Sequence, residues 1–279
     1  MSDDVLPGAS VRDMRSSAGR DYRIFVWQPE PRPREPMPVL YLLDGNGTFP
    51  IAAAALALQS RRAERTGVAP SVIVGIGYPT SHWIDAGRRT YDYTPPVAAG
   101  RLAQRPGNRA WDETGGADLF LDFIERELSP FIAREFAIDP DRTALFGHSF
   151  GGLFALYALL TRPRLVRSYV AASPSIWFAP DDLKERLASF AAPDVARRRV
   201  LVTVGSLEQG AMSGDSDADD YGSWIRRNRM VDNAREFSAA LSQAAETLDV
   251  SFRMFDDENH ASVVPSAISL ALRFALPPK

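Results

Sequence analysis

The chain of 279 residues contains no cysteine. This absence excludes disulfides, cysteine nucleophiles and thiolate metal ligands, although it does not identify a redox compartment. Positive charge is not in excess either, because 32 Lys and Arg face 35 Asp and Glu and the formal net charge is −3. We therefore expect no general attraction to nucleic acid or to an anionic membrane surface.

Long hydrophobic runs are also missing. The most apolar stretch near the N-terminus, IAAAALALQS at residues 51–60, is far too short to cross a bilayer. The first ten residues, MSDDVLPGAS, are acidic and lack the apolar core of a secretory signal. The sequence as written predicts a cytoplasmic protein. A periplasmic chain from which a signal has been removed would look the same.

Short apolar segments rich in β-branched residues alternate with helical patterns. Strands are predicted at residues 22–28, 39–43, 71–78, 142–147, 168–175, 199–206 and 248–255, and helices at 49–65, 117–136, 149–163, 231–246 and 261–276. Two stretches, 79–114 and 206–230, are expected to be long irregular loops. This order predicts one α/β domain over residues 1–279, with a mostly parallel sheet covered by helices on both faces. Ligand sites of such sheets lie beyond the carboxyl ends of the strands.

A Gly-x-Ser-x-Gly pentapeptide, GHSFG at residues 147–151, follows one predicted strand and opens the next helix. Small neighbours let a serine occupy a strained strand-to-helix turn with its hydroxyl exposed. The helix N-terminus also favours negative charge that develops there. Ser149 is therefore the predicted nucleophile. The alternative is a structural serine in an ordinary tight turn.

A serine hydroxyl needs a general base, and the chain has three histidines. His260 follows the last predicted strand at the entry to the final helix, where a hydrolase with the chain order Ser, acid, His carries its base. His148 lies inside the pentapeptide and is expected to point away from Ser149 as a structural residue. His82, after the strand at 71–78, is a candidate for lining the pocket.

The base in turn needs a carboxylate that fixes its tautomer. Glu208 is the candidate because it lies just past the predicted strand at 199–206, near the edge of the sheet. The competing carboxylates lie in the same acidic loop or beside the base: Asp215, Asp217, Asp219, Asp220, Asp256, Asp257 and Glu258.

An oxyanion formed by attack on a carbonyl needs two preorganised N–H donors. One is expected to be the backbone N–H of Phe150, directly after the nucleophile. The other is expected in DGNGTF, after the strand at 39–43, with the N–H of Asn46 as the first choice and that of Gly45 as the alternative. Asp44 is expected to shape this loop and not to take part in catalysis.

With these residues in place, the chain resembles the esterase branch of the α/β-hydrolases that includes esterase D, the mycolyltransferases and the trilactone siderophore esterases. The matching segments extend over residues 15–276 and include YLLDGNGTF, RRTYDYTPP, ASPSIWF and NHASVVP. The combination of LLDGN, RTYDYTP and SPSIW is most similar to the siderophore-esterase group. That group hydrolyses the ester backbone of enterobactin-like or bacillibactin-like catecholate siderophores and so releases iron.

The resemblance implies an α/β-hydrolase fold with Ser149 as nucleophile and His260 as base. Glu208 falls where many members carry the acid, although some members work mainly as a Ser–His dyad. Arg88 or Arg89 falls where the group carries an arginine that faces the substrate. A guanidinium suits a ferric tris-catecholate, whose net charge is about −3 and whose rings a cation can stack on.

Other residues are weaker candidates for contact with the substrate. Trp177 is a candidate aromatic wall, although a tryptophan at such a position is often part of the core. Arg226, Arg227 and Arg229 form a second basic cluster near Glu208.

The predicted reaction is acyl transfer through Ser149 to water, and it needs no metal or organic cofactor. The predicted partner is a small-molecule ester, with no nucleic acid or membrane partner. A broad-specificity carboxylesterase or acyltransferase on the same machinery is the first alternative. A non-catalytic binding protein of the same fold is the second.

Overall fold

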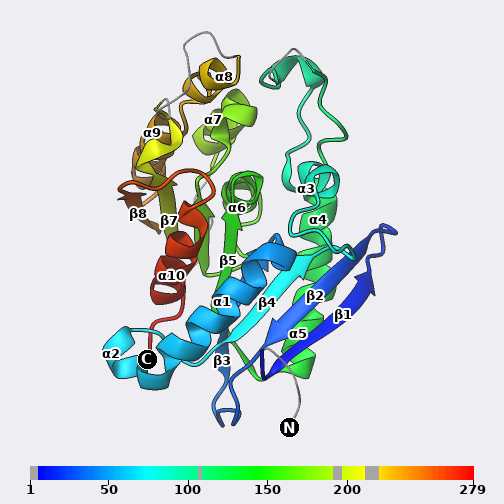
Figure 1. Ribbon diagram of the computed structural model, residues 1–279, viewed down its shortest axis with the longest axis vertical. Coiled ribbons are helices and arrows are strands. Elements are labelled where there is room, and N and C mark those ends of the chain that lie inside the picture. The colour runs from blue at the N-terminus through cyan, green and yellow to red at the C-terminus, as the bar shows by residue number, and fades with distance from the viewer. Residues whose placement is uncertain (1–5, 106–108, 191–196, 211–219) are drawn as a thin grey trace.

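One mixed sheet of eight strands organises the molecule (Figure 1). The computed structural model describes residues 6–105, 109–190, 197–210 and 220–279. The strand order is β1-β2-β4-β3-β5-β6-β7-β8, in which β2 pairs antiparallel with both β1 and β4 and the pairs from β4 to β8 are parallel. The strands are β1 (Ala9–Arg15), β2 (Asp21–Trp27), β3 (Met37–Leu43), β4 (Val72–Gly77), β5 (Ile138–His148), β6 (Ser168–Ala172), β7 (Arg198–Gly205) and β8 (Leu248–Phe255).

Helices cover both faces of this sheet, which confirms the predicted α/β-hydrolase architecture. One face packs on α1 (Gly45–Gln59) and α10 (Val263–Ala275), and the other on α4 (Ala117–Phe123), α6 (Phe150–Thr161) and α9 (Met230–Ala244). The remaining helices are α2 (Ala63–Thr66), α3 (Ala86–Tyr93), α5 (Ser129–Glu135), α7 (Pro180–Ala188) and α8 (Asp220–Asn228), and a single π-helical turn, Ile124–Leu128, joins α4 to α5. No helix in the described ranges is long and apolar enough to span a bilayer.

The central strands are buried on both faces, as their unbroken apolar sequences indicate. All seven residues of β3 and all six of β4 are buried, whereas β1 at the edge of the sheet is mostly exposed. Because β3, β4, β5, β6, β7 and β8 run the same way, their carboxyl ends lie at one edge of the sheet. The loops that carry the predicted site residues therefore converge there.

The two predicted long loops each contain a helix, which corrects the sequence interpretation. Helix α3 lies within 79–114, and its N-terminus is capped by the Asp85 side chain, which accepts a hydrogen bond from the Arg88 N–H at 3.1 Å. Helix α8 lies within 206–230. Both helices were missed because their sequences are polar and short, so that no long apolar stripe identifies them.

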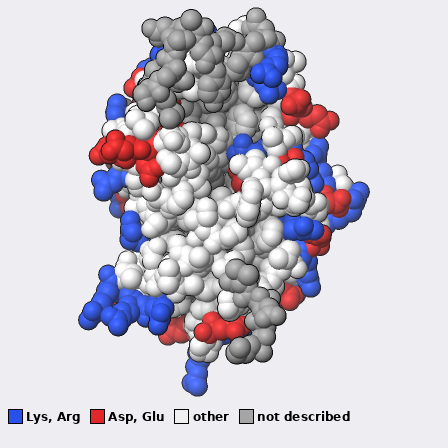
Figure 2. All heavy atoms as spheres, in the orientation of Figure 1, with Lys and Arg blue, Asp and Glu red and all other residues white. Residues whose placement is uncertain are grey.

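Charged side chains lie mainly around the rim of the face shown in Figure 2, whose centre is largely uncharged. A hollow opens in the upper half of this face. The helices α7, α8 and α9 lie on one side of the upper part of the molecule, and α3 with the segment that follows it lies on the other (Figure 1).

The junction between β5 and α6 gives a direct test of the fold. A methyl group on Gly147 would collide with the backbone of Gly151 in the first turn of α6. We expect Gly147→Ala to lower the free energy of unfolding by about 1–3 kcal/mol in urea titrations. Gly100→Ala is the control, because no atom lies within 4 Å of the added carbon, and it should change stability by less than about 0.5 kcal/mol. Equal stability of the two variants would contradict the described packing.

Candidate active site

Ser149 occupies the turn between β5 and α6, as the Gly-x-Ser-x-Gly pattern predicted. Its backbone has φ 61° and ψ −117°, which is a strained conformation for a residue other than glycine. The Ser149 N–H donates to the carbonyl of Ala172 at 2.9 Å, and its own carbonyl accepts from the N–H groups of Leu153 and Ser175. These three backbone hydrogen bonds hold the serine at the carboxyl edge of the sheet.

Glu208 and His260 are brought together from the segments that follow β7 and β8. The Glu208 Oε2 lies 2.6 Å from the His260 Nδ1. The other oxygen, Oε1, accepts from the Gly205 N–H and from the Ser173 hydroxyl, both at 2.6 Å. With Nδ1 engaged by the carboxylate, the ring nitrogen Nε2 is the one left to exchange a proton with a substrate or a nucleophile.

The burial of these two side chains differs sharply. The Glu208 side chain is 1% exposed and the His260 side chain is 48% exposed. The carboxylate therefore sits in the protein, whereas the imidazole reaches into the space above the sheet edge. This arrangement lets a buried negative charge stabilise an imidazolium that forms at the surface of the site.

His148 links the nucleophile turn to the base. Its ring lies 4.6 Å from the His260 ring, centroid to centroid, at an interplanar angle of 41°. Burial lowers the pKa of His148 well below its usual value, and the neighbouring His260 and Arg89 lower it further. From the sequence, His148 was predicted only to be a structural residue. Its contact with His260 arises because the loops that follow β5 and β8, which are distant in the chain, lie next to each other in the fold.

Ser149 itself is hydrogen-bonded to another serine. Within the described residues, its Oγ lies 3.3 Å from the Ser175 Oγ, and no hydrogen bond joins it to His260. Catalytic hydrogen bonds are often long or unformed when no substrate is bound. The neighbouring residue, His148, packs on the His260 ring, so the nucleophile turn and the loop that carries the base are in contact.

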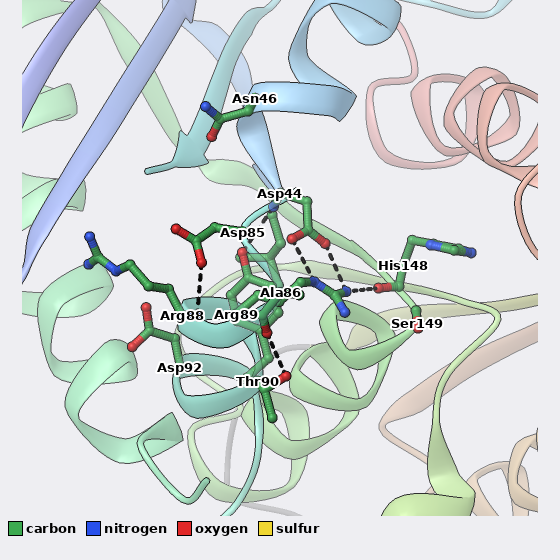
Figure 3. Close-up of polar contacts among 12 residues, drawn as sticks. Asp44, Asn46, Asp85, Ala86, Arg88, Arg89, Thr90, Asp92, His148 and Ser149 are labelled. Carbon is green, nitrogen blue, oxygen red and sulfur yellow. Dashed lines mark hydrogen bonds and ion pairs between the residues drawn. The ribbon is translucent and has the colours of Figure 1, made fainter. Parts of the chain in front are cut away.

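The predicted oxyanion donors lie at two helix N-termini. Phe150 begins α6, and Gly45 and Asn46 begin α1. The N–H groups of these three residues have no hydrogen-bond acceptor among the described residues, as is usual for the first turn of a helix. The Asn46 side chain points away from Ser149 and binds the backbone of Tyr78 and Thr80 (Figure 3).

Asp44 and Arg89 form a buried ion pair beside the nucleophile turn (Figure 3). The Arg89 Nε and Nη2 donate to the two Asp44 carboxylate oxygens at 2.8 and 3.0 Å, and Nη2 also donates to the His148 carbonyl at 3.1 Å. Asp44 has φ 54°, and its N–H donates to the Tyr93 hydroxyl at 3.0 Å. The pair therefore fixes the loop after β3 against the loop after β5.

The arginines of α3 are not arranged as the sequence suggested. Arg89 is 8% exposed and its charge is paired with that of Asp44, so in the structure it joins two loops of the site. The Arg88 guanidinium lies over the rings of Tyr78 and Tyr22, at 4.6 and 5.5 Å from their centroids. Figure 3 shows it on the side of α3 away from Ser149, toward Asp92. Because α3 is a helix, the neighbouring residues Arg88 and Arg89 point to different faces of it. A prediction that treated this segment as a loop could not include that constraint.

Trp177 belongs to an aromatic cluster beside the nucleophile. Its ring lies 5.1 Å from that of Trp224 and 6.0 Å from those of Trp111 and Phe150. We call Trp111, Trp177 and Trp224 the tryptophan cluster. Each is partly exposed, and Phe150 joins the cluster to Ser149. Trp111 and Trp224 were not identified from the sequence. Both lie in the long segments predicted at 79–114 and 206–230, and this position could have marked them as candidates for the site.

The remaining candidates lie elsewhere. His82, Asp256 and Asp257 are exposed, and the Glu258 carboxylate accepts from Ser266. Asp215, Asp217 and Asp219 lie outside the described residues, and Asp220 begins α8. In the second basic cluster, Arg229 pairs with Asp232 and Glu236, Arg226 donates to Ser223, and Arg227 is exposed.

The contact between Glu208 and His260 leads to a prediction about the activity of a Glu208 variant. Glu208→Gln keeps an oxygen and the size of the side chain but removes the charge that stabilises an imidazolium. We expect kcat on an ester substrate to fall by roughly 10³- to 10⁴-fold. Glu258→Gln is the matched control, because its carboxylate contacts Ser266 and not His260, and it should retain activity within about twofold. Full activity of Glu208→Gln would show that a Ser–His dyad suffices.

Comparisons with known proteins agree with this architecture. Residues 16–246 match the family model described as "Putative esterase". The chain is 42% identical to the ferri-bacillibactin esterase BesA of Bacillus subtilis over 98% of its length and 91% of that protein's. It is 33% identical to a siderophore triacetylfusarinine C esterase of Aspergillus fumigatus over 96% of the chain and 92% of the relative. The crystal structure of the BES protein from Bacillus cereus superposes with a TM-score of 0.83 at 36% identity, covering 100% of this chain and 99% of that one. The chain thus belongs to the putative esterase family of α/β-hydrolases.

Proposed function

We propose that this protein is a serine esterase that hydrolyses the ester backbone of a catecholate siderophore and so releases its iron. The observation that carries the proposal is the Glu208–His260 hydrogen bond of 2.6 Å beside the Ser149 turn. The 42% identity to a ferri-bacillibactin esterase over almost the whole chain supports the class of substrate.

The proposed reaction has two acyl-transfer steps. Ser149 attacks the ester carbonyl while His260 Nε2 accepts the hydroxyl proton, and the Glu208 carboxylate stabilises the imidazolium. The N–H groups of Phe150 and Asn46 hold the oxyanion, and His260 returns the proton to the leaving alcohol. Water then attacks the acyl-enzyme by the same route, which frees Ser149 and releases the acid.

The tryptophan cluster favours a substrate with aromatic arms. Its rings come from three separate segments, and two of them, Trp111 and Trp177, stand beside Phe150, the residue after the nucleophile. The indole N–H of Trp111 donates to the Ala103 carbonyl at 2.7 Å, and that of Trp224 to the Gln104 carbonyl at 3.2 Å. With their polar edges engaged in this way, the indoles offer apolar faces and edges on which a catechol ring can stack.

A cation lies beside the Trp111 ring of this cluster, which suits the negative charge of a catecholate. The Arg105 guanidinium lies 5.1 Å from the centroid of the Trp111 ring, and both residues line a hollow of about 430 Å³ together with Arg109. Arg105 is also 3.5 Å from Asp112, so part of its charge is balanced. We therefore propose Arg105, in addition to Arg88 or Arg89, as an arginine positioned to meet a catecholate arm.

Side-by-side hydrolysis of two esters tests the proposed function. Wild type and Ser149→Ala are assayed on ferric enterobactin and on p-nitrophenyl butyrate. We expect kcat/KM on the cyclic triester to exceed that on the simple ester by roughly 10²-fold or more, because only the triester engages the aromatic site. Ser149→Ala should lose both activities. Equal or better turnover of p-nitrophenyl butyrate by wild type would favour a broad carboxylesterase.

The aromatic site makes a separate prediction. Trp224→Ala should lower kcat/KM on the catecholate triester by about tenfold, the loss of one stacking contact, and leave p-nitrophenyl butyrate within about twofold. Trp224→Phe keeps a ring and should retain most of the triester activity. Trp83→Ala is the control, since this tryptophan is 71% exposed and outside the cluster. Equal losses on both esters would contradict a role in recognising the aromatic arm.

A further inference from the structure

The tripeptide Ser173–Pro174–Ser175 follows β6 and contacts both ends of the catalytic arrangement. The Ser173 hydroxyl donates to the Glu208 Oε1 at 2.6 Å, and the Ser175 Oγ lies 3.3 Å from the Ser149 Oγ. The Ser175 N–H also donates to the Ser149 carbonyl at 3.1 Å. Two hydrogen bonds thus join Ser175 to the nucleophile, and neither belongs to the mechanism given above.

The backbone around Ser175 is held firmly. A carbon added to Gly152 in α6 would lie 2.9 Å from the Pro174 Cα, so this helix and the tripeptide are in close contact. The Ser173 N–H donates to the Thr203 carbonyl at 2.7 Å, and the Ser175 carbonyl accepts from the Phe178 N–H at 3.0 Å. The position of the Ser175 hydroxyl is therefore set by packing and not by a flexible loop.

Burial decides which serine donates. Ser175 is 1% exposed, and its hydroxyl has no partner other than the Ser149 Oγ among the described residues. A buried O–H that donates to nothing is costly, whereas Ser149 is partly exposed and can use water. Donation from Ser175 to Ser149 satisfies the buried group. It also leaves the Ser149 proton free to turn toward His260.

We propose that Ser175 is a catalytic residue whose hydroxyl donates a hydrogen bond to the Ser149 Oγ and stabilises the negative charge that develops on this oxygen. During attack the Ser149 proton passes to His260 Nε2 and the Oγ–carbonyl carbon bond forms, while the Ser175 proton stays on Ser175. In deacylation the same bond breaks, and the Ser149 Oγ again carries partial charge until His260 returns a proton. The hydrogen bond is stronger in both transition states than in the resting enzyme.

The inference rests on Ser149 being the nucleophile of the proposed function. Two reagents that do not depend on the identity of the siderophore test it: a fluorophosphonate, which reports phosphonylation of Ser149, and p-nitrophenyl butyrate. If wild type is not labelled at Ser149, the proposed function itself fails. If wild type is labelled and Ser175→Ala is labelled equally fast, only the present inference fails.

For Ser175→Ala we expect kcat and the phosphonylation rate to fall together by about tenfold, with KM changed less than about twofold. A purely structural defect would instead change KM and thermal stability along with kcat. A rise in KM at unchanged kcat would overturn the inference, because it would assign Ser175 to substrate binding.

Two further variants keep the test decisive if Ser175→Ala does not fold. Ser175→Thr retains a hydroxyl donor, whereas Ser175→Cys keeps the shape of serine but carries the weakly donating S–H group, in a chain with no other cysteine. We expect Ser175→Thr to be phosphonylated several-fold faster than Ser175→Cys. Equal rates, or a faster cysteine variant, would contradict hydrogen-bond donation by residue 175.

Discussion

The strained backbone of Ser149 is the constraint on which the rest of the site depends. A residue with φ 61° and ψ −117° costs on the order of 1–3 kcal/mol and persists only where its surroundings hold it. In this protein, three hydrogen bonds maintain the conformation. The Ala172 carbonyl at the end of β6 accepts the serine N–H, the Ser175 N–H binds the serine carbonyl, and Arg89 binds the carbonyl of the preceding residue. Glycines at 147 and 152 allow α6 to approach closely enough for these contacts to form.

The negative charges of two buried carboxylates near this turn, Asp44 and Glu208, are paired in different ways. This difference decides which of the two charges can take part in catalysis. Asp44 is fully paired by the Arg89 guanidinium, a permanent cation, so it contributes structure and leaves little net charge in the site. Glu208 is held by a backbone N–H and a serine hydroxyl, and among the described residues its single ion-pair partner is His260. Its charge is therefore available whenever the imidazole is protonated. In the proposed mechanism this occurs at the moment of proton transfer.

Much of this could be predicted from the sequence because the relevant signals are local. Alternation of β-branched runs with helical patterns indicated the sheet and its helices, and GHSFG indicated the turn at Ser149. Chain order alone then pointed to Glu208 and His260, which the fold joins at 2.6 Å. The helix α3 could not be predicted in the same way because it is short and polar. The orientations of Arg88 and Arg89, which depend on this helix, therefore could not be predicted either. Arg89 carries the same charge whether it faces a ligand or an internal carboxylate, and no local pattern distinguishes the two.

The sequence by itself determined most of the strands and the long helices, since these depend on the spacing of apolar residues and on the glycines at the turn. It also determined the order in which a serine, a carboxylate and a histidine appear at the carboxyl edge of the sheet. The tertiary structure alone decided which groups meet there. Asp44 with Arg89, His148 with His260, Ser175 with Ser149 and the three rings of the tryptophan cluster are each brought together from segments distant in the chain. Such contacts depend on how the loops of neighbouring strands pack over the sheet edge, which the local sequence does not encode.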